Sequence, residues 1–430
     1  MSFLNPKYQE AVQFKRSTYG IRKVIRLYEE KNDELIIPRG ALYKILPLVG
    51  PPNKIHNNTA IFKKVDIPSK IEMRPLQEPW IEDMLKHFQG VGVAPPGSGK
   101  TVMALEVIAR LGQPTLWLTH RQGLVEQFKE RAGFFIGGGD VGIIGDGKYE
   151  IGKVLTAGMI QTLIKRDLTE LSHKFGLIIL DEGHICPAEQ TMEVIRKFAP
   201  QYLYGLTATP YREDKLEQIM FDTIGPCIAY LDRQEVVDAD GIMPAKILVR
   251  KTGVTHNPAI HSRYDKIIKY LTTHTARNIL ILADVLTEIA LGNICILLTN
   301  RVEHGKIIKR ELKALGVDSV HIHAKTTNKK RKEYTAQFKS GEVALMIATY
   351  SLLKEGFDHK PTNRIFFALP HKAKGIIEQA KGRIERTAPG KTNAVVYDYV
   401  DSIPMLQRQF EMRYEQYQEH NLVMIDSTPL

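Results

Sequence analysis

The segment APPGSGKT, residues 94–101, combines glycines, a lysine and a hydroxyl in the order that phosphate binding requires. It follows an apolar run and opens an amphipathic one, so we predict a turn between a strand and a helix. Backbone N–H groups of such a turn point inward, and the helix N-terminus adds positive potential. Lys100 is expected to reach the β- and γ-phosphates, and the Thr101 hydroxyl to lie on Mg²⁺. The alternative is a glycine-rich turn without a ligand; the turn itself consists of Pro96, Gly97, Ser98 and Gly99.

Two adjacent carboxylates end the apolar run LIILDEGH, residues 177–184. Asp181 is suited to hold Mg²⁺ through water, and Glu182 to orient and deprotonate an attacking water. An Asp-Glu pair at a strand end is common by chance, but after a phosphate-binding turn it indicates nucleotide hydrolysis. We expect His184 to link the nucleotide to the motif that follows.

Two further motifs depend on this context. LTATPYR, residues 206–212, offers the hydroxyls of Thr207 and Thr209, although alone it would be read as a turn. QAKGRIER, residues 379–386, lies on a predicted helix. Its polar residues follow at spacings of four and three, which is one helical face, and they are Gln379, Arg383 and Arg386. Such arginines would stabilise charge on a γ-phosphate, and a solvated basic face is the alternative.

Strand-like and helical runs alternate from Glu72 onward, and the alternation occurs twice, with a junction between residues 211 and 276. Strands separated by helices imply parallel sheets buried on both faces. We therefore predict an α/β fold with two lobes. Residues 1–73 differ: they contain 13 Lys/Arg against 7 Asp/Glu, a net charge of +6, and short β-like runs broken by prolines. These features predict a small, basic, sheet-rich N-terminal domain.

The motifs APPGSGKT, DEGH, TATP, LLKEGFD and QAKGRIER, in this order, resemble motifs I, II, III, V and VI of the superfamily 2 helicases. The resemblance spans residues 74–401 and implies two tandem RecA-like lobes that close on ATP and move along one strand. It also implies further nucleotide contacts, at Arg74, Gln77, Gly356 and Asp358. Strand contacts are implied at His120, Arg121, Gln161, Thr162, Asn300, Arg301, Lys325 and Lys354.

Within this superfamily the chain is similar to XPB-type repair helicases and to phage UvsW-type branch-migration helicases. DEGH replaces Asp-Glu-Ala-Asp, and an Arg-Glu-Asp element follows motif III at residues 212–214. Both families also place a small domain before the motor. The expected boundaries are 1–73 for that domain, with a possible role in duplex or junction binding, 74–245 and 246–404 for the lobes, and 405–430 for a C-terminal helix.

The composition agrees with a nucleic-acid enzyme without proving one. The chain has 430 residues, a net charge of +11 and three scattered cysteines. We expect a cytoplasmic monomer (in the host cytoplasm if the protein is viral) with no membrane segment. The predicted activity is ATP- and Mg²⁺-dependent DNA unwinding or translocation on branched DNA. The alternatives are the motor subunit of a restriction system, an RNA helicase, and a scaffold that binds nucleotide without hydrolysis. Intact Glu182, Arg383 and Arg386 argue against the scaffold.

Overall fold

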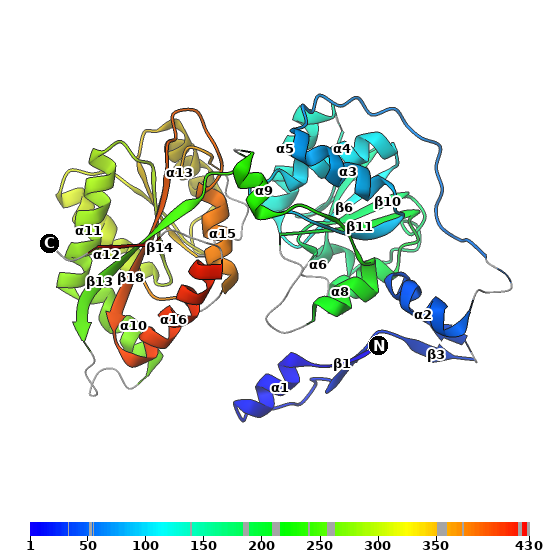
Figure 1. Ribbon diagram of the computed structural model, residues 1–430, viewed down its shortest axis with the longest axis horizontal. Coiled ribbons are helices and arrows are strands. Elements are labelled where there is room, and N and C mark those ends of the chain that lie inside the picture. Colours follow the sequence, from blue (N-terminus) through cyan, green and yellow to red (C-terminus); the bar gives the residue numbers. More distant parts are fainter. Residues whose placement is uncertain are drawn as a thin grey trace. The chain divides into compact units, whose positions relative to one another are not determined.

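The computed structural model describes the chain except residues 33, 51–53, 55, 138–139, 184–188, 209–215, 240, 256–262, 351–358, 372–373, 420–423 and 428–430. Two compact units make up the fold, Met1–Val236 and Val237–Leu430 (Figure 1). A large sheet of mainly parallel strands forms the centre of each unit. The predicted α/β fold with two tandem parallel-sheet lobes is therefore confirmed.

The sheet of the first unit has the strand order β12-β5-β11-β10-β6-β9-β7-β8. Its strands are β5 (Gln89–Val93), β6 (Thr115–Thr119), β7 (Gly142–Gly145), β8 (Lys148–Tyr149), β9 (Leu155–Met159), β10 (Leu177–Leu180), β11 (Tyr202–Thr207) and β12 (Cys227–Tyr230). Neighbouring strands pair in parallel except β7 with β8 at the edge. The strands β6 and β10 are buried along their whole length, as expected for a parallel sheet that is covered on both faces.

Helices cover this sheet, namely α3 (Glu78–Leu85), α4 (Lys100–Leu111), α5 (Gln122–Phe135), α6 (Ile160–Leu163), α7 (Glu189–Arg196) and α8 (Glu217–Ile224), and a further helix, α9 (Arg233–Asp238), spans the boundary between the units. Trp80 of α3 packs directly against β5. Its indole N–H donates to the carbonyl of Val93 at 3.0 Å. A Cβ on Gly92 would lie 2.2 Å from the Trp80 ring, so glycine is required there. This contact fixes α3 against the strand that leads into the phosphate-binding turn.

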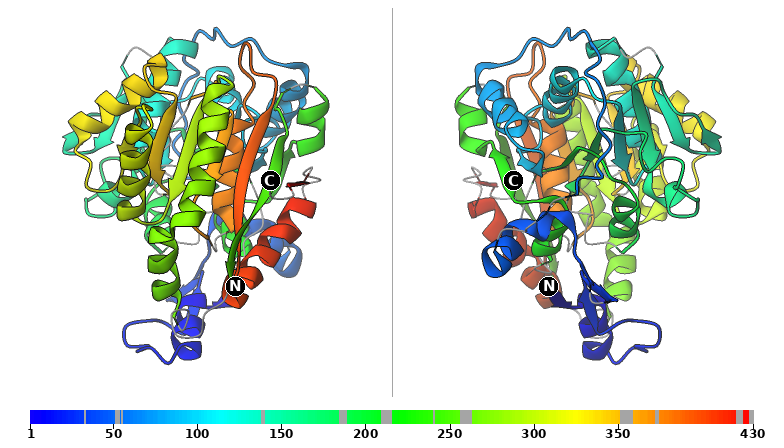
Figure 2. Two further views of the ribbon diagram at one scale, coloured as in Figure 1. Left: turned by 90° about the vertical axis from the view of Figure 1, so that its left-hand side faces the viewer. Right: turned by 90° about the vertical axis from the view of Figure 1, so that its right-hand side faces the viewer.

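The sheet of the second unit is parallel throughout, with the order β15-β16-β14-β17-β18-β13-β19. Its strands are β13 (Ala245–Thr255), β14 (Cys295–Thr299), β15 (Val320–Ile322), β16 (Leu345–Thr349), β17 (Arg364–Phe367), β18 (Ala394–Ser402) and β19 (Met424–Ser427). Figure 2 shows helices on both sides of these strands, and they are α10 (Tyr264–Thr273), α11 (Thr275–Ala290), α12 (Val302–Ala314), α13 (Asn328–Ser340), α15 (Lys374–Ile384) and α16 (Pro404–Glu419). Alternate residues of β14 enter two separate core clusters, Ile296 and Leu298 in one and Cys295 and Leu297 in the other. This alternation places one cluster on each face of the sheet.

The N-terminal segment contains short elements: β1 (Ser2–Leu4), α1 (Pro6–Gln13), β2 (Val24–Arg26), β3 (Glu29–Lys31), β4 (Glu34–Ile36) and α2 (Leu42–Val49). β1 pairs with β2 and β3 with β4, both antiparallel. The expected small sheets are thus present. They belong to the same compact unit as the first parallel sheet.

Arg39 joins this segment to the first sheet. Its guanidinium donates to the carbonyls of Pro200, at 2.6 Å, and Gln201, at 3.1 Å. It also donates to the side chain of Gln89, whose own amide returns a hydrogen bond to the Arg39 carbonyl at 2.9 Å. Gln89 begins β5 and Gln201 directly precedes β11, so a single arginine connects the segment to two central strands.

A second contact lies beside Arg39, where the backbone of Gly40 approaches helix α8. A Cβ on Gly40 would lie 2.6 Å from the Phe221 carbonyl oxygen. Lys44 then places its ammonium 2.6 Å from the buried carboxylate of Asp222. These contacts favour packing of the segment on the first unit, which is one of the two roles that its sequence allows.

The C-terminal region contains a strand as well as the expected helix. After α16 the chain forms β19, which pairs in parallel with β13. β19 covers a strand edge that would otherwise expose unpaired backbone groups. β13 itself begins at Ala245, the residue at which the sequence-based boundary ends the first lobe, and it belongs wholly to the second sheet. Among the described residues, none of the helices combines the length and apolar character needed to cross a membrane.

Replacing Arg39 with leucine should destabilise the first unit by about 2–4 kcal/mol, because two carbonyls and one amide oxygen lose their donor. Denaturant unfolding followed by tryptophan fluorescence measures this unit alone, since both tryptophans, Trp80 and Trp117, lie in it. Arg16→Leu is the control, because the ion pair of Arg16 with Glu10 is exposed and should contribute less than about 0.5 kcal/mol. Equal midpoints for the two variants would contradict a structural role for Arg39.

Candidate nucleotide and nucleic-acid site

The candidate nucleotide site lies at the carboxyl edge of the first sheet, where parallel sheets commonly bind ligands. β5 leads into the phosphate-binding turn, β10 leads into Asp181 and Glu182, and β11 ends at Thr207. The buried Thr207 accepts a backbone hydrogen bond from Ala94 at 3.1 Å. The turn after β5 is thereby held to the end of β11, which bears the third motif.

The phosphate-binding turn has the geometry predicted from its sequence. The Lys100 ammonium donates to the Ala94 carbonyl at 2.9 Å, and the Ser98 hydroxyl donates to the Pro95 carbonyl at 2.8 Å. Gly99 has a φ of 95° and forms the N-cap of α4, a conformation that glycine adopts without steric penalty. One strand-to-helix turn therefore holds Pro96, Gly97, Ser98, Gly99, Lys100 and Thr101.

Gln77 connects the predicted adenine-recognition residues to this turn. Its amide nitrogen donates to the Ser98 carbonyl at 2.8 Å, and its amide oxygen accepts the backbone N–H of Arg74 at 3.0 Å. Gln77 is buried, whereas Arg74 is exposed. The structure thus brings the predicted contact residues for the base and for the phosphates together in the first unit.

Asp181 and Glu182 have different environments although they are adjacent. The Asp181 carboxyl is enclosed by protein, and this burial, reinforced by the charge of Glu182, raises its pKa to about 7 against an opposing effect of Lys100. The Glu182 N–H donates to the Asp181 carboxylate at 3.0 Å. Glu182 also has a φ of 55°, a left-handed conformation that costs free energy in a residue with a side chain. Strain of this kind is found mainly at functional sites.

Sequence reasoning missed Arg131, a half-buried residue of α5. Its positive charge lowers the pKa of Asp181, as that of Lys100 does. Helix α5 buries Val125, Phe128 and Ala132, and Arg131 lies at the margin of that buried face. The sequence did contain a signal for this residue: Arg131 follows the apolar Phe128 by three positions on a predicted helix, which places it beside the buried face.

The oxygen atoms at this edge fit a magnesium ion. Mg²⁺ takes one or two carboxylates together with water and substrate phosphates, and rarely a cage made wholly of protein ligands. The Asp181 carboxylate and the Thr101 hydroxyl offer such oxygens, and a bound cation would oppose the burial that raises the pKa of Asp181. The described residues contain no group of three His, Cys, Asp or Glu side chains that could hold a metal alone.

The predicted strand-binding residues of the first unit follow neighbouring strands. His120 and Arg121 come after β6, and Gln161 and Thr162 lie in α6 directly after β9. β6 and β9 pair in parallel as far as Thr119 and Met159, so the two motifs lie side by side at the carboxyl edge. The Arg121 guanidinium donates to His120 Nε2 at 2.8 Å.

In the second unit the predicted strand-binding residues also lie at the carboxyl edge of the sheet. Asn300 follows β14, and its side chain donates to the Pro370 carbonyl at 3.2 Å. Arg301 forms an exposed ion pair with Asp265 at 2.9 Å. Lys325 is exposed, beyond the end of β15. The Asn300 side chain is therefore engaged within the protein, while Arg301 and Lys325 face solvent.

The arginine motif departs from prediction in one respect. Gln379 and Arg383 lie on α15 as expected, but the helix ends at Ile384, so Arg386 is not on its face. The chain leaves the helix because residue 386 forms a β-bridge with Ile242, and the Met243 N–H donates to the Glu385 carbonyl at 2.6 Å.

Several predicted site residues lie outside the described part of the chain: His184, Thr209, Lys354, Gly356 and Asp358, together with the Arg-Glu-Asp element at 212–214. The same holds for the side chain of Gln379. Their predicted roles stay predictions.

Each of the two sheets contains the strands of one family match, although β12, β13, β18 and β19 lie outside the matched residues. Residues 70–212 match the res subunit of type III restriction enzymes, and residues 266–388 match the helicase conserved C-terminal domain. The DNA 3'-5' translocase XPB2 of Sulfurisphaera tokodaii is 35% identical over 205 residues, which are 48% of this chain and 45% of that protein. The probable helicase D10 of Escherichia phage T5 is 26% identical over 334 residues, 78% of this chain and 72% of that protein.

Among solved structures, S. cerevisiae Dbp5 bound to RNA and ADP BeF3 has a TM-score of 0.57 at 15% identity. The alignment covers 84% of this chain and 90% of Dbp5. At this identity the likeness concerns the fold. The chain spans less than half the length of the XPB2 relative.

Replacing Asp181 with asparagine should stabilise the first unit at neutral pH. The folded pKa of Asp181 lies above its unfolded value near 4, so the unfolded chain binds fewer protons between those values and stability falls as pH rises from about 4 to about 7. The amide does not titrate, and the gain should therefore grow over that window. Denaturant unfolding at pH 5 and pH 8 measures it. A variant less stable than the parent at pH 8 would contradict the assigned burial cost.

Proposed function

This chain carries both motor domains of the superfamily 2 DNA helicases, resembling the XPB type, and we propose that it uses ATP hydrolysis to translocate on branched DNA such as forks and junctions. The observation that supports the proposal is that three predicted nucleotide-binding motifs lie together at the carboxyl edge of the first sheet. There Gln77, the phosphate-binding turn and Asp181 lie together in the order that the motifs imply.

The proposed chemistry assigns one role to each group. The turn and Lys100 hold the β- and γ-phosphates of ATP. Thr101 and Asp181 would hold Mg²⁺, which when bound neutralises charge on the phosphates. Glu182 orients a water for attack and takes its proton. Arg383 and Arg386 of the second unit supply the positive charge that the transferring phosphoryl group needs.

DNA is the proposed partner rather than RNA. The relative with 35% identity is named a DNA translocase, whereas the RNA-bound likeness concerns the fold at 15% identity. Branched substrates are proposed from the DEGH and TATPYRED resemblances and from the basic residues 1–73. We further propose that the protein acts as a monomer in the cytoplasm, on the sequence argument alone. The match of residues 70–212 keeps the restriction-system motor as the second candidate.

The test is ATP turnover measured without nucleic acid and with single-stranded DNA, junction DNA, duplex DNA or RNA. We expect junction DNA to give the largest stimulation. Lys100→Ala should abolish turnover but keep most DNA affinity, because affinity arises from many backbone contacts and Lys100 serves the phosphates. If RNA stimulated ATP turnover and none of the DNAs did, the nucleic-acid partner would be RNA and not DNA. Stimulation by plain duplex without a junction preference would favour the restriction-system motor, and turnover by Lys100→Ala near the parent rate would refute the phosphate-site assignment.

The junction role of residues 1–73 is tested by charge reversal, since Arg39 and Gly40 pack this segment on the first unit and deletion would uncover that surface. Arg22, Lys23 and Arg26 are exposed. Changing all three to glutamate should lower junction-stimulated ATPase and make the salt dependence of junction binding shallower. Stimulation by single-stranded DNA should change less than about twofold. As a control, Lys86→Glu changes an exposed charge that pairs locally with Asp83. Equal junction activity in the triple variant and the parent would rule out this role.

A further inference from the structure

Four consecutive carbonyls after β17 accept hydrogen bonds from side chains of separate elements. We call residues Ala368–His371 the β17 exit. Its side-chain donors come from α10, α11, the end of β16, the loop after β14, and α16: Arg277 to Ala368 at 2.6 Å, Tyr350 to Leu369 at 2.8 Å, Asn300 and Tyr264 to Pro370 at 3.2 and 3.4 Å, and Arg413 to His371 at 3.1 Å. Each carbonyl of this short segment therefore has at least one side-chain donor, and Pro370 has two.

This arrangement follows from burial. Ala368 and Leu369 are fully buried, and Pro370 is buried as well. The segment lies beyond the end of β17, so its carbonyls are outside the strand pairing that serves β17. A buried carbonyl without a donor costs about 1–3 kcal/mol, so this path requires side-chain donors along its length.

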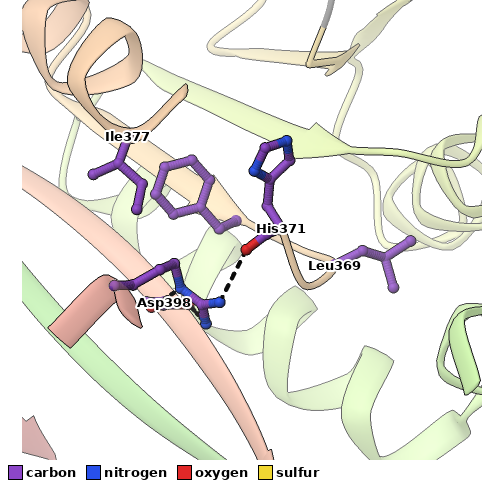
Figure 3. Close-up of a pocket in the computed structure, with 6 residues that line it drawn as sticks. Leu369, His371, Ile377 and Asp398 are labelled. Atoms are coloured by element: carbon purple, nitrogen blue, oxygen red, sulfur yellow. Dashed lines mark hydrogen bonds and ion pairs between the residues drawn. The ribbon is translucent and has the colours of Figure 1, made fainter. Parts of the chain in front are cut away.

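The Arg413 contact is itself strongly anchored. Its guanidinium makes two hydrogen bonds to the buried carboxylate of Asp398, at 3.0 and 3.1 Å, and the Tyr417 hydroxyl donates to the same carboxylate at 2.9 Å. Figure 3 shows Asp398 and the hydrogen bond to the His371 carbonyl, with Leu369 and Ile377 nearby. The C-terminal helix α16 is thus attached both to β18 and to the β17 exit.

The β17 exit leads toward helix α15, which bears Gln379 and Arg383. The inner face of α15, Ile377, Ala380 and Ile384, lies in the same core cluster as Tyr350. The Tyr350 ring also lies against the His371 ring, with ring centroids 4.5 Å apart and the ring planes tilted by 50°. Tyr350 therefore touches the path into the helix twice, at the Leu369 carbonyl and at the His371 ring.

Two of these donors lie at or beside predicted nucleic-acid motifs. Asn300 is a predicted strand-binding residue, and Tyr350 directly precedes residues 351–358, which contain the LLKEGFD sequence that resembles motif V. We propose that Asn300 and Tyr350 are positioning residues for Arg383. Both hold the β17 exit, which leads into α15, so they fix the position of the first turn of α15. A shift of the strand-binding motifs when they bind a strand would therefore move α15 and Arg383. This inference rests on the proposed function. In the second unit, the carbonyls of the β17 exit would then link strand binding to ATP turnover.

Tyr350→Phe is the test, because it removes the hydroxyl and keeps the ring. The kcat of DNA-stimulated ATPase should fall about tenfold or more, since a small displacement of a catalytic group has effects of that order. The KM for ATP and the Kd for DNA should change less than about threefold. Tyr397→Phe is the matched control. It removes a buried hydroxyl bonded to Glu288 on the opposite face of the same sheet, away from the β17 exit.

A double variant decides whether Tyr350 acts through Arg383. Tyr350→Phe combined with Arg383→Ala should be no slower than Arg383→Ala alone, because the positioned group is already absent. Multiplying effects in the double variant, or equal losses of kcat in Tyr350→Phe and Tyr397→Phe, would overturn the inference while leaving the proposed function intact. Absence of DNA-stimulated ATPase in the parent protein would instead refute the proposed function, and the inference with it.

Discussion

Parallel pairing of β5, β11 and β10 brings their carboxyl ends to one edge of the first sheet, and the candidate nucleotide site takes its geometry from that pairing. Val93 lies opposite Thr207, and Leu180 lies opposite both Gly205 and Leu118. A slip of one residue would turn every buried side chain of a strand to the other face, so the core fixes the register. The buried side chains of these strands allow only one alignment. That alignment places the strand ends that carry Lys100, Asp181 and Thr207 at the same edge of the sheet.

The same edge carries costs that the rest of the unit must offset. Asp181 is held where its charge is poorly solvated, and Glu182 is held in a strained conformation. Lys100 and Arg131 reduce the cost of the Asp181 charge without removing it, since its pKa stays raised. A cation bound beside Asp181 would favour the charged form of its carboxyl, so cation binding and ionisation of Asp181 would stabilise each other.

Local chemistry was predictable from the sequence, whereas long-range partners were not. The glycines, Lys100 and Asp181 lie at strand ends, where neighbours in sequence define the motif, and the structure has them as expected. Arg386 was misplaced because helical periodicity continues past Ile384, and the bridge to Ile242 that ends the helix involves a residue over a hundred positions away. The burial of Arg277 and Arg413 was not predictable from the sequence. Charged residues on amphipathic runs are usually exposed, and the acceptors of these two arginines, which include the carboxylates of Asp401 and Asp398, are distant in sequence or are backbone carbonyls.

Arg39 and Arg413 lie outside the two matched family regions, yet each donates hydrogen bonds to backbone carbonyls beside the end of a strand within them. Arg39 donates just before β11 begins, and Arg413 donates just after β17 ends. Guanidinium suits this task, because its planar fork can bond a carbonyl and a second acceptor at once, which a lysine ammonium does with less geometric control. Each arginine uses this property, because it bonds a side chain as well as backbone carbonyls: Gln89 accepts from Arg39, and Asp398 accepts from Arg413. Segments outside the two matched regions are thus attached to the sheets by partners that are distant in sequence, which explains why short local motifs do not reveal these attachments.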